Sequence, residues 1–249
     1  MEVHHHPIAI GSHTARKKWT HYFWEFLMLF LAVFCGFLAE YQLEHKIEKN
    51  REKQFIESYI EDLETDTTTA RRIVANLERK QAQLDTFMLL LKSDQIRGHE
   101  NELYYFGRTL LRSSQFQRND RTISQLINSG SWRLIRNKQA VDSMIYYNRI
   151  TESSEQDQQT EELERKNCIP LLEKIFDPFI FDSMLDEKGI HRVVNNPPLR
   201  SYDRALQKDL AHRLHQIKGS YFIIVIRLKV IEKKAFNLIG LLKKEYHLK

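Results

Sequence analysis

The stretch IESYIEDLETDTTTARRIVANLERKQAQLDTFMLLLK, from Ile56 to Lys92, decides the fold of this chain. A mostly apolar stripe recurs in it at alternating steps of four and three residues and keeps its phase over five heptads, at Ile56, Ile60, Leu63, Thr67, Ala70, Val74, Leu77, Gln81, Leu84, Met88 and Leu91. Such a stripe is typical of a helix that buries one face against a partner helix. Thr67 and Gln81 are polar, and we expect them to fix the register of that packing.

Upstream of this stretch lies an uninterrupted run of fourteen apolar residues, from Phe26 to Ala39. With its flanks, the segment 22–41 would span about 30 Å as a helix, close to the thickness of the hydrocarbon core of a bilayer. Trp19 and Tyr41 lie where amphipathic rings settle at membrane interfaces. We predict one transmembrane helix over 22–41 that continues through charged residues into a long stalk or coiled-coil helix over 42–92.

A cleaved signal peptide is the alternative to an anchor, because the basic residues 16–18 precede the apolar run. Phe37 fits poorly at a small-residue cleavage position, so the anchor is preferred. Basic residues flank the run on both sides, and we expect the short basic tail over 1–21 to determine the orientation. The prediction is a cytoplasmic N-terminus, with the long C-terminal part outside the cytoplasm.

Downstream, the segment 93–200 is predicted to form a middle helical subdomain with loops. Asn137 has the residue type of an N-cap, and the Gly and Pro residues of 179–199 indicate a loop. Ser201 is expected to cap a long C-terminal helix over 201–249. The stripe of that helix again alternates four and three, at Leu214, Ile217 or Lys218, Tyr221, Val225, Leu228, Glu232, Ala235, Ile239, Leu242 and Tyr246.

The two stripes predict an all-α protein in which an antiparallel helical bundle or coiled coil follows the transmembrane helix. The low content of glycine and proline, 8 and 5 residues, also favours long helices over a turn-rich β fold. The C-terminal helix is expected to pack back on the stalk, although either helix has the pattern to pair with a second chain instead. Its apolar run 221–226 is too short for a second membrane crossing.

Composition argues against several functions. The formal net charge is +5, but basic and acidic residues are interleaved without a basic block, so nucleic-acid binding is not expected. Trp132 follows a turn between two predicted helices, and we expect it to fill a core rather than to lie in a DNA groove. Cys35 and Cys168 are the two cysteines, and they provide no disulfide framework.

No segment has the spacing of a catalytic motif or a phosphate-binding loop. We therefore assign no catalytic, cofactor-binding or metal residue and predict that the chain is not an enzyme. Asp209, His212 and His215 share a helix face and are the strongest metal candidates, but a bundle metal site needs matching ligands on a second helix. The histidines at 4–6 have no supporting ligands nearby in the sequence.

The block from Trp24 to Asp62, WEFLMLFLAVFCGFLAEYQLEHKIEKNREKQFIESYIED, resembles the N-terminal signature of a family of uncharacterised bacterial single-pass membrane proteins. The phrases QLINSGSWRLIRNKQAVDSMIYYN (Gln125 to Asn148) and LIGLLKKEYHL (Leu238 to Leu248) resemble its central motif and its ending. The resemblance touches both ends and the middle of the chain. It implies a membrane location and a helical extramembrane domain, and it carries over no functional residue.

Together these features predict a non-enzymatic, membrane-anchored protein of the bacterial inner membrane with a periplasmic C-terminal domain. We expect it to act through protein contacts, as a scaffold, a spacer or a partner in a complex. Its expected partners are the lipid bilayer and either another protein or a second copy, since Ala32, Gly36 and Ala39 form a small-residue seam in the anchor. No small-molecule substrate is identified. The alternative is a sensory or ligand-binding helical bundle that signals through a separate partner.

Overall fold

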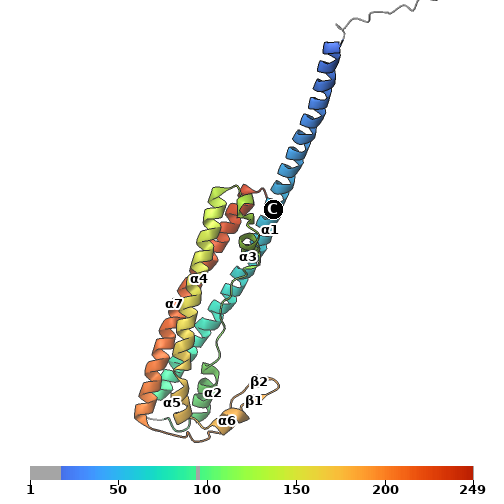
Figure 1. Cartoon of the computed structure of the whole chain (residues 1–249). Coiled ribbons are helices and arrows are strands. Elements are labelled where there is room, and N and C mark those ends of the chain that lie inside the picture. Colours follow the sequence, from blue (N-terminus) through green and yellow to red (C-terminus); the bar gives the residue numbers. More distant parts are fainter. Residues whose placement is uncertain (1–17, 94–95, 249) are drawn as a thin grey trace, which may run out of the picture. The chain divides into compact units, whose positions relative to one another are not determined.

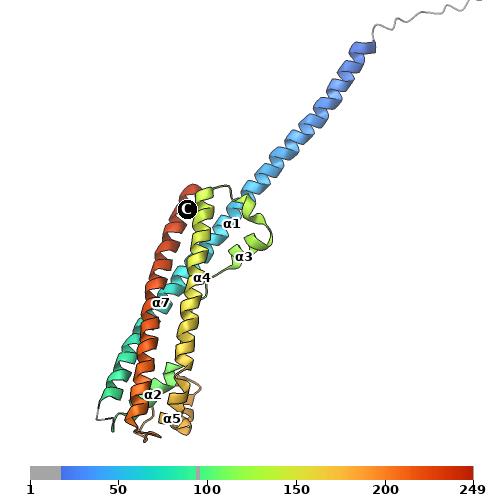
Figure 2. The ribbon, with the colours of Figure 1, turned by 60° about the vertical axis from the view of Figure 1, so that its left-hand side comes forward.

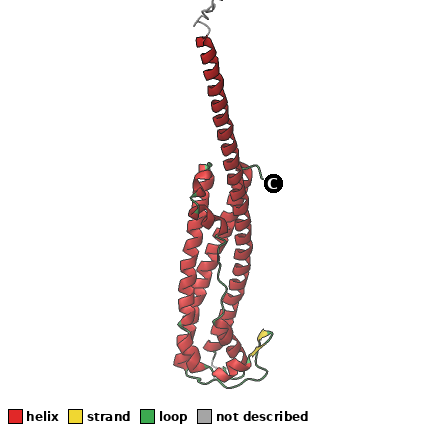
Figure 3. Ribbon diagram, turned by 45° about the vertical axis from the view of Figure 1, so that its right-hand side comes forward, coloured by secondary structure: helices red, strands yellow, loops and turns green. Residues whose placement is uncertain are grey.

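The computed structural model describes residues 18–93 and 96–248. The chain divides into two compact units, an N-terminal unit that ends at Glu52 and a bundle that begins at Lys53. Apart from loops, the described residues are helical except for one short hairpin, yellow in Figure 3, in which β1 (Leu185–Asp186) pairs antiparallel with β2 (Gly189–Ile190). The prediction of an all-α fold is confirmed.

The described part of the N-terminal unit belongs to α1 (Lys18–Lys92), which also contributes its second half to the bundle. An 18-residue window of this helix has a mean hydropathy of 2.0 and no buried residue, so the helix is long and apolar enough to cross a membrane. Ala32, Gly36 and Ala39 are exposed on it, and a Cβ at Gly36 would meet no described atom within 4 Å. The predicted small-residue seam is therefore open along its length.

The bundle is built around the second half of α1 together with α4 (Lys138–Lys166) and α7 (Arg204–Glu245), which lie side by side in Figures 1 and 2. Ion pairs show that α1 and α7 are antiparallel, because residues early in one contact residues late in the other. Glu64 lies 3.5 Å from Lys243, and Asp85 lies 2.5 Å from Lys218. Between α4 and α7, Asn137–Glu245 at 2.8 Å and Glu164–Ser220 at 2.7 Å follow the same antiparallel order.

Burial along α1 agrees with the predicted heptad period. The stripe positions that are spaced seven residues apart in the sequence, starting at Ile56, are all buried: Ile56, Leu63, Ala70, Leu77, Leu84 and Leu91. The positions between them are shifted by one residue, because Tyr59, Asp66, Ile73 and Phe87 are more deeply buried than Ile60, Thr67, Val74 and Met88. The expectation that Thr67 and Gln81 lie in the seam is wrong, since both are only half-buried, and Asp66 is buried in place of Thr67.

The stripe of α7 shows the same shift. Ile217 rather than Lys218 is buried, and Ile224, Ile231 and Leu238 are more deeply buried than the residues that follow them. A shift of one residue in both helices shows that each one contacts neighbours over a face wider than a single two-helix seam. The bundle unit as a whole, which begins at Lys53, includes the helices of 93–200.

Short helices connect the long ones: α2 (Glu100–Leu110), α3 (Arg121–Asn128), the 3-10 turn η2 (Ser131–Leu134), α5 (Ile169–Ile175) and α6 (Pro178–Ser183). The predicted cap of α4 is confirmed, because Asn137 Oδ1 accepts the Ala140 N–H at 3.0 Å. Two other predictions are wrong. The predicted loop 179–199 contains most of α6 and the hairpin, and α7 is capped by Asp203, which accepts the Ala205 N–H at 2.8 Å, rather than by Ser201.

Residues 112–120 link α2 to α3 without regular secondary structure and run along the bundle as the extended loop visible in Figure 3. This extended segment contacts both α1 and α4. Asn76 of α1 donates to Ser114 at 2.9 Å, and Gln158 of α4 binds the backbone of Phe116 at both its N–H and its C=O. An extended backbone packed against helices needs such partners wherever it is buried, as at Phe116, because its polar groups form no regular hydrogen-bond pattern of their own.

Candidate functional site

The structure brings the sequence-based metal candidates to the surface. Asp209, His212 and His215 are exposed on α7. Within residues 18–93 and 96–248, no group of three or more His, Cys, Asp and Glu side chains is placed to hold a metal ion. The histidines at 4–6 lie outside the described residues.

Sequence reasoning missed a cluster of buried polar residues where α3 begins. The first N–H groups of a helix have no partner within it, and the N-cap residue Asp120 does not satisfy them. Asp62 of α1 does so instead, because its Oδ2 accepts the Thr122 N–H at 2.9 Å. Its Oδ1 lies 3.0 Å from the guanidinium of Arg121. A carboxylate at this helix terminus also interacts favourably with the helix dipole.

Asp66 lies one helical turn further along α1 and is 2% exposed. Its Oδ1 accepts the Asn119 N–H at 2.6 Å, and its Oδ2 accepts the Tyr147 hydroxyl of α4 at 2.9 Å. Burial raises the pKa of Asp66 to about 6, although both hydrogen bonds oppose this effect. Burial also raises the pKa of Tyr147 above its usual value, so this hydroxyl stays protonated and remains a donor.

A complementary basic group lies where α2 ends. The last carbonyls of a helix are unpaired within it and favour cations. Lys80 of α1 donates to Thr109 O at 3.4 Å, and Arg165 of α4 donates to Leu111 O at 2.7 Å. Glu161, itself 2% exposed, holds the Arg165 guanidinium at 2.9 Å. Burial lowers the pKa of Lys80, because removing its charged ammonium from water is unfavourable.

The buried charges therefore hold the extended segment at both of its ends. Acids from α1 bind the amide groups where α3 begins, and bases from α1 and α4 bind the carbonyls where α2 ends. All of these carboxylates already accept hydrogen bonds or ion pairs, which is typical of a structural network and not of a nucleophile or a proton-transfer site. The cluster ties the extended segment to α1 and α4, and among the described residues it offers no open position for a substrate.

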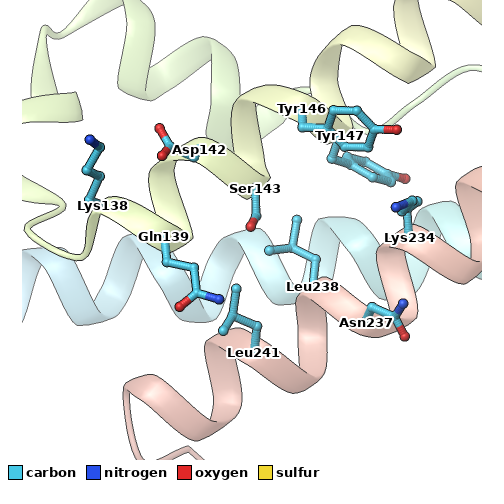
Figure 4. A pocket seen from close by; sticks show the side chains of 10 residues that line it. All are labelled: Lys138, Gln139, Asp142, Ser143, Tyr146, Tyr147, Lys234, Asn237, Leu238 and Leu241. Atoms are coloured by element: carbon cyan, nitrogen blue, oxygen red, sulfur yellow. The ribbon is translucent and has the colours of Figure 1, made fainter.

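A groove of about 710 Å³ separates α4 and α7 near the start of α4. Figure 4 shows its walls, with Gln139 and Ser143 on α4 pointing toward Leu238 and Leu241 on α7. Lys234 lies 5.1 Å from the centre of the Tyr146 ring, so its cation already has a partner. The groove has no converging set of unpaired polar groups among its lining residues, and we assign it no ligand.

The outer face of α7 carries a group of exposed apolar side chains. Phe222 and Ile223 lie four and three residues before Ile226, and Val230 lies four residues after it. All four are on the side opposite the buried stripe and are 59%, 51%, 49% and 44% exposed in chain order. A helix that is apolar on both of its faces is typical of a helix that is covered on both. We call these four side chains the α7 stripe.

Lysines continue the α7 stripe toward both ends of the helix. Lys208 and Lys244 are each eighteen residues from Ile226, which is five full turns, and Lys233 is seven residues away. All three lysines are exposed and form no ion pair within the described part of the chain. The basic residues on the flanks of α7 are instead paired with α1 or α4, as in Lys229–Glu78 at 2.7 Å.

Comparisons of the chain with family models, with curated proteins and with solved structures found no match. The resemblance to the single-pass membrane family therefore stays a prediction.

Proposed function

We propose that this chain is a non-enzymatic, membrane-anchored protein of the bacterial cell envelope that acts through protein contacts, with the α7 stripe as its contact surface. The single observation that carries the proposal is the stripe itself, an apolar helix face extended by unpaired lysines. The N-terminal helix supports the anchor, because it is apolar enough to cross a membrane. We place the N-terminus in the cytoplasm and the bundle in the periplasm, at the inner membrane.

The apolar part of the surface supplies the driving force. Burying an apolar side chain completely contributes about 1.5–3 kcal/mol, and the four residues of the α7 stripe are each about half exposed. Covering all four would contribute on the order of 3–6 kcal/mol before the cost of association. Such a contact is weak for two free proteins, and tethering both partners to one membrane raises their effective concentration.

The charges select the kind of partner. Lys208, Lys233 and Lys244 need acidic residues opposite them, so we propose a helix of another protein with apolar residues at three- and four-residue spacing and Asp or Glu on its flanks. A second copy fits less well, because copies anchored in one membrane run parallel and would bring Lys233 against Lys233. A flat bilayer would also meet the acidic side chains of the ion pairs beside the stripe, such as Glu78.

The proposal is tested by placing a photo-crosslinking amino acid at position 223 of the full chain in native membranes. We expect a crosslink to a peptide of another protein that has the apolar and acidic pattern given above. Reversing two charges, Lys208→Glu with Lys233→Glu, should abolish that crosslink. Reversal of the exposed Arg79 on α1 is the matched control and should leave it intact. A crosslink to a second copy, a crosslink only to lipid, or no crosslink would each contradict the proposed partner.

Orientation is tested separately, by protease treatment of intact spheroplasts. A periplasmic bundle should be degraded from outside, whereas protection of the bundle until the membrane is opened would overturn the proposed topology.

A further inference from the structure

A second hollow lies where α2, α5 and α6 meet, away from the α7 stripe. Its volume is about 200 Å³, and its apolar wall is formed by Leu111, Ile169, Leu172, Phe176, Pro178 and Phe181. A dry cavity of about 150 Å³ lined by such side chains is large enough for benzene. This α2–α5 cavity is therefore large enough for one small aromatic or short aliphatic group.

The back of the cavity is rigid. Phe176 and Phe181 stack at 5.3 Å between ring centres, and Tyr104 meets both rings edge-on at 5.2 and 5.6 Å. The Tyr104 hydroxyl donates to Pro198 O at 3.0 Å and accepts the Asp177 N–H at 3.2 Å, which fixes the group in place. Gly107 permits this packing, because a Cβ there would lie 3.1 Å from the Phe176 ring. A preformed wall lowers the ordering cost of binding a ligand.

The cavity also has a basic side. Arg108 and Arg200 both line it, together with Glu173. Arg108 lies 5.9 Å from the centre of the Phe181 ring, and its buried Nε has no hydrogen-bond partner within the described residues. Arg200 donates to the Glu173 carbonyl oxygen at 3.0 Å, which places its guanidinium at the rim. A carboxylate is the group that a guanidinium binds best, through two parallel hydrogen bonds.

We propose that the α2–α5 cavity binds small apolar carboxylates, with the apolar group against Phe176 and Phe181 and the carboxylate on Arg108. Arg200 adds positive charge at the rim. The one acidic lining residue, Glu173, leaves the three charged side chains with a net positive charge, which favours an anion over a cation of the same shape. This site is independent of the protein contact proposed for α7, because no residue of the α7 stripe lines it.

The test uses three fluorinated probes of nearly equal shape and different charge: 4-fluorobenzoate, 4-fluorobenzamide and 4-fluorobenzylamine. Their binding to the full chain in lipid nanodiscs is measured by fluorine NMR relaxation, with empty nanodiscs as the blank. We expect the benzoate to bind and the amide to bind at least about tenfold more weakly, since a hydrogen bond to a charged group is lost. The amine should show no binding above the blank.

Single substitutions test separately how the charge of Arg108 and the volume of the cavity contribute to binding. Arg108→Gln should weaken benzoate at least about tenfold and leave the amide unchanged. Ile169→Phe fills the hollow and should weaken benzoate and amide alike. Arg112→Gln, an exposed position beyond the end of α2, is the matched control and should change neither. Thermal unfolding of each variant shows that it is folded.

Each contrary result is decisive. Equal affinity for the benzoate and the amide would remove the carboxylate from the proposal, and so would unchanged benzoate binding in Arg108→Gln. Absence of benzoate binding to the wild-type chain would overturn the site. None of these outcomes bears on crosslinking at position 223, so the two proposals fail or succeed separately.

Discussion

Replacing Asp66 by asparagine is expected to remove a pH dependence from the stability of the bundle. Asparagine has the same shape as aspartate and preserves both contacts, because its Oδ1 can accept the Asn119 N–H and its Nδ2 can donate to the Tyr147 oxygen. It differs in having no titratable proton. Comparing the two proteins at each pH therefore isolates the titration of Asp66 from that of every other acid.

The magnitude follows from the pKa in the two states. Burial raises the folded pKa of Asp66 from 3.8 to about 6, which corresponds to about 3 kcal/mol. Between these values the folded state binds more protons than the unfolded state, so the stability from Asp66 is present at low pH and is lost as the pH rises through about 6. The free energy of unfolding of wild type relative to Asp66→Asn should therefore fall by about 2.4 kcal/mol between pH 4 and pH 7, which is most of the full difference.

The assay is urea unfolding of the full chain in mild detergent, followed by circular dichroism at several pH values from about 3.5 to 7.5, which bracket both pKa values. As the pH rises, Asp66→Asn should gain stability relative to wild type. The difference between their free energies of unfolding at neutral pH should therefore favour asparagine more than the difference in acid does. If the two free-energy profiles run parallel across this range, Asp66 does not titrate in the folded bundle as argued, and its burial between α1 and α4 is incorrect.

Three further substitutions test the packing by the same unfolding assay. Gln158→Leu should lower the free energy of unfolding by roughly 2–5 kcal/mol, because both backbone groups of Phe116 lose their partner. The exposed Gln159→Leu should lower it little, and equal losses would contradict the role of Gln158 as the partner of this backbone. Tyr147→Phe should destabilise by about 1–3 kcal/mol because Asp66 loses a donor, while Tyr59→Phe should be neutral or stabilising, since the described residues offer no partner to the Tyr59 hydroxyl; the reverse order would refute the network. Phe87→Ala should cost about 3–5 kcal/mol, and a cost below about 1 kcal/mol would mean that the seam does not have the observed phase.

The heptad period could be predicted from sequence because it depends on α1 alone. The phase of the positions between those heptad residues could not be predicted, because the sequence has two adjacent apolar residues there, at 59 and 60 and again at 73 and 74. The neighbours of α1 decide between them. A phase through Tyr59, Asp66, Ile73 and Phe87 places an aspartate in the core, which a pattern of apolar residues does not predict.

The hydrogen-bond donors that stabilise the two buried aspartates are far from them in the sequence. Asp66 and Asp62 bind backbone amides at 119 and 122, which are 53 and 60 residues later. Nothing in the local pattern reveals that an extended segment packs along the bundle and needs acceptors for its backbone. Three of the four residues of the α7 stripe belong to the apolar run 221–226 in the sequence, but only the structure shows which residues of that run are exposed.

The central claim, that the α7 stripe is covered by a protein partner, is tested most directly by cysteine labelling. Ile226→Cys in a Cys35→Ser background is treated with a maleimide in intact spheroplasts and again after purification in detergent. The remaining Cys168 is buried, which raises the pKa of its thiol to about 11, so it should stay unreactive. We expect the thiol at position 226 to be protected in the membrane and labelled once purified, while a control Arg79→Cys labels in both. Equal labelling at position 226 in both preparations would contradict the claim.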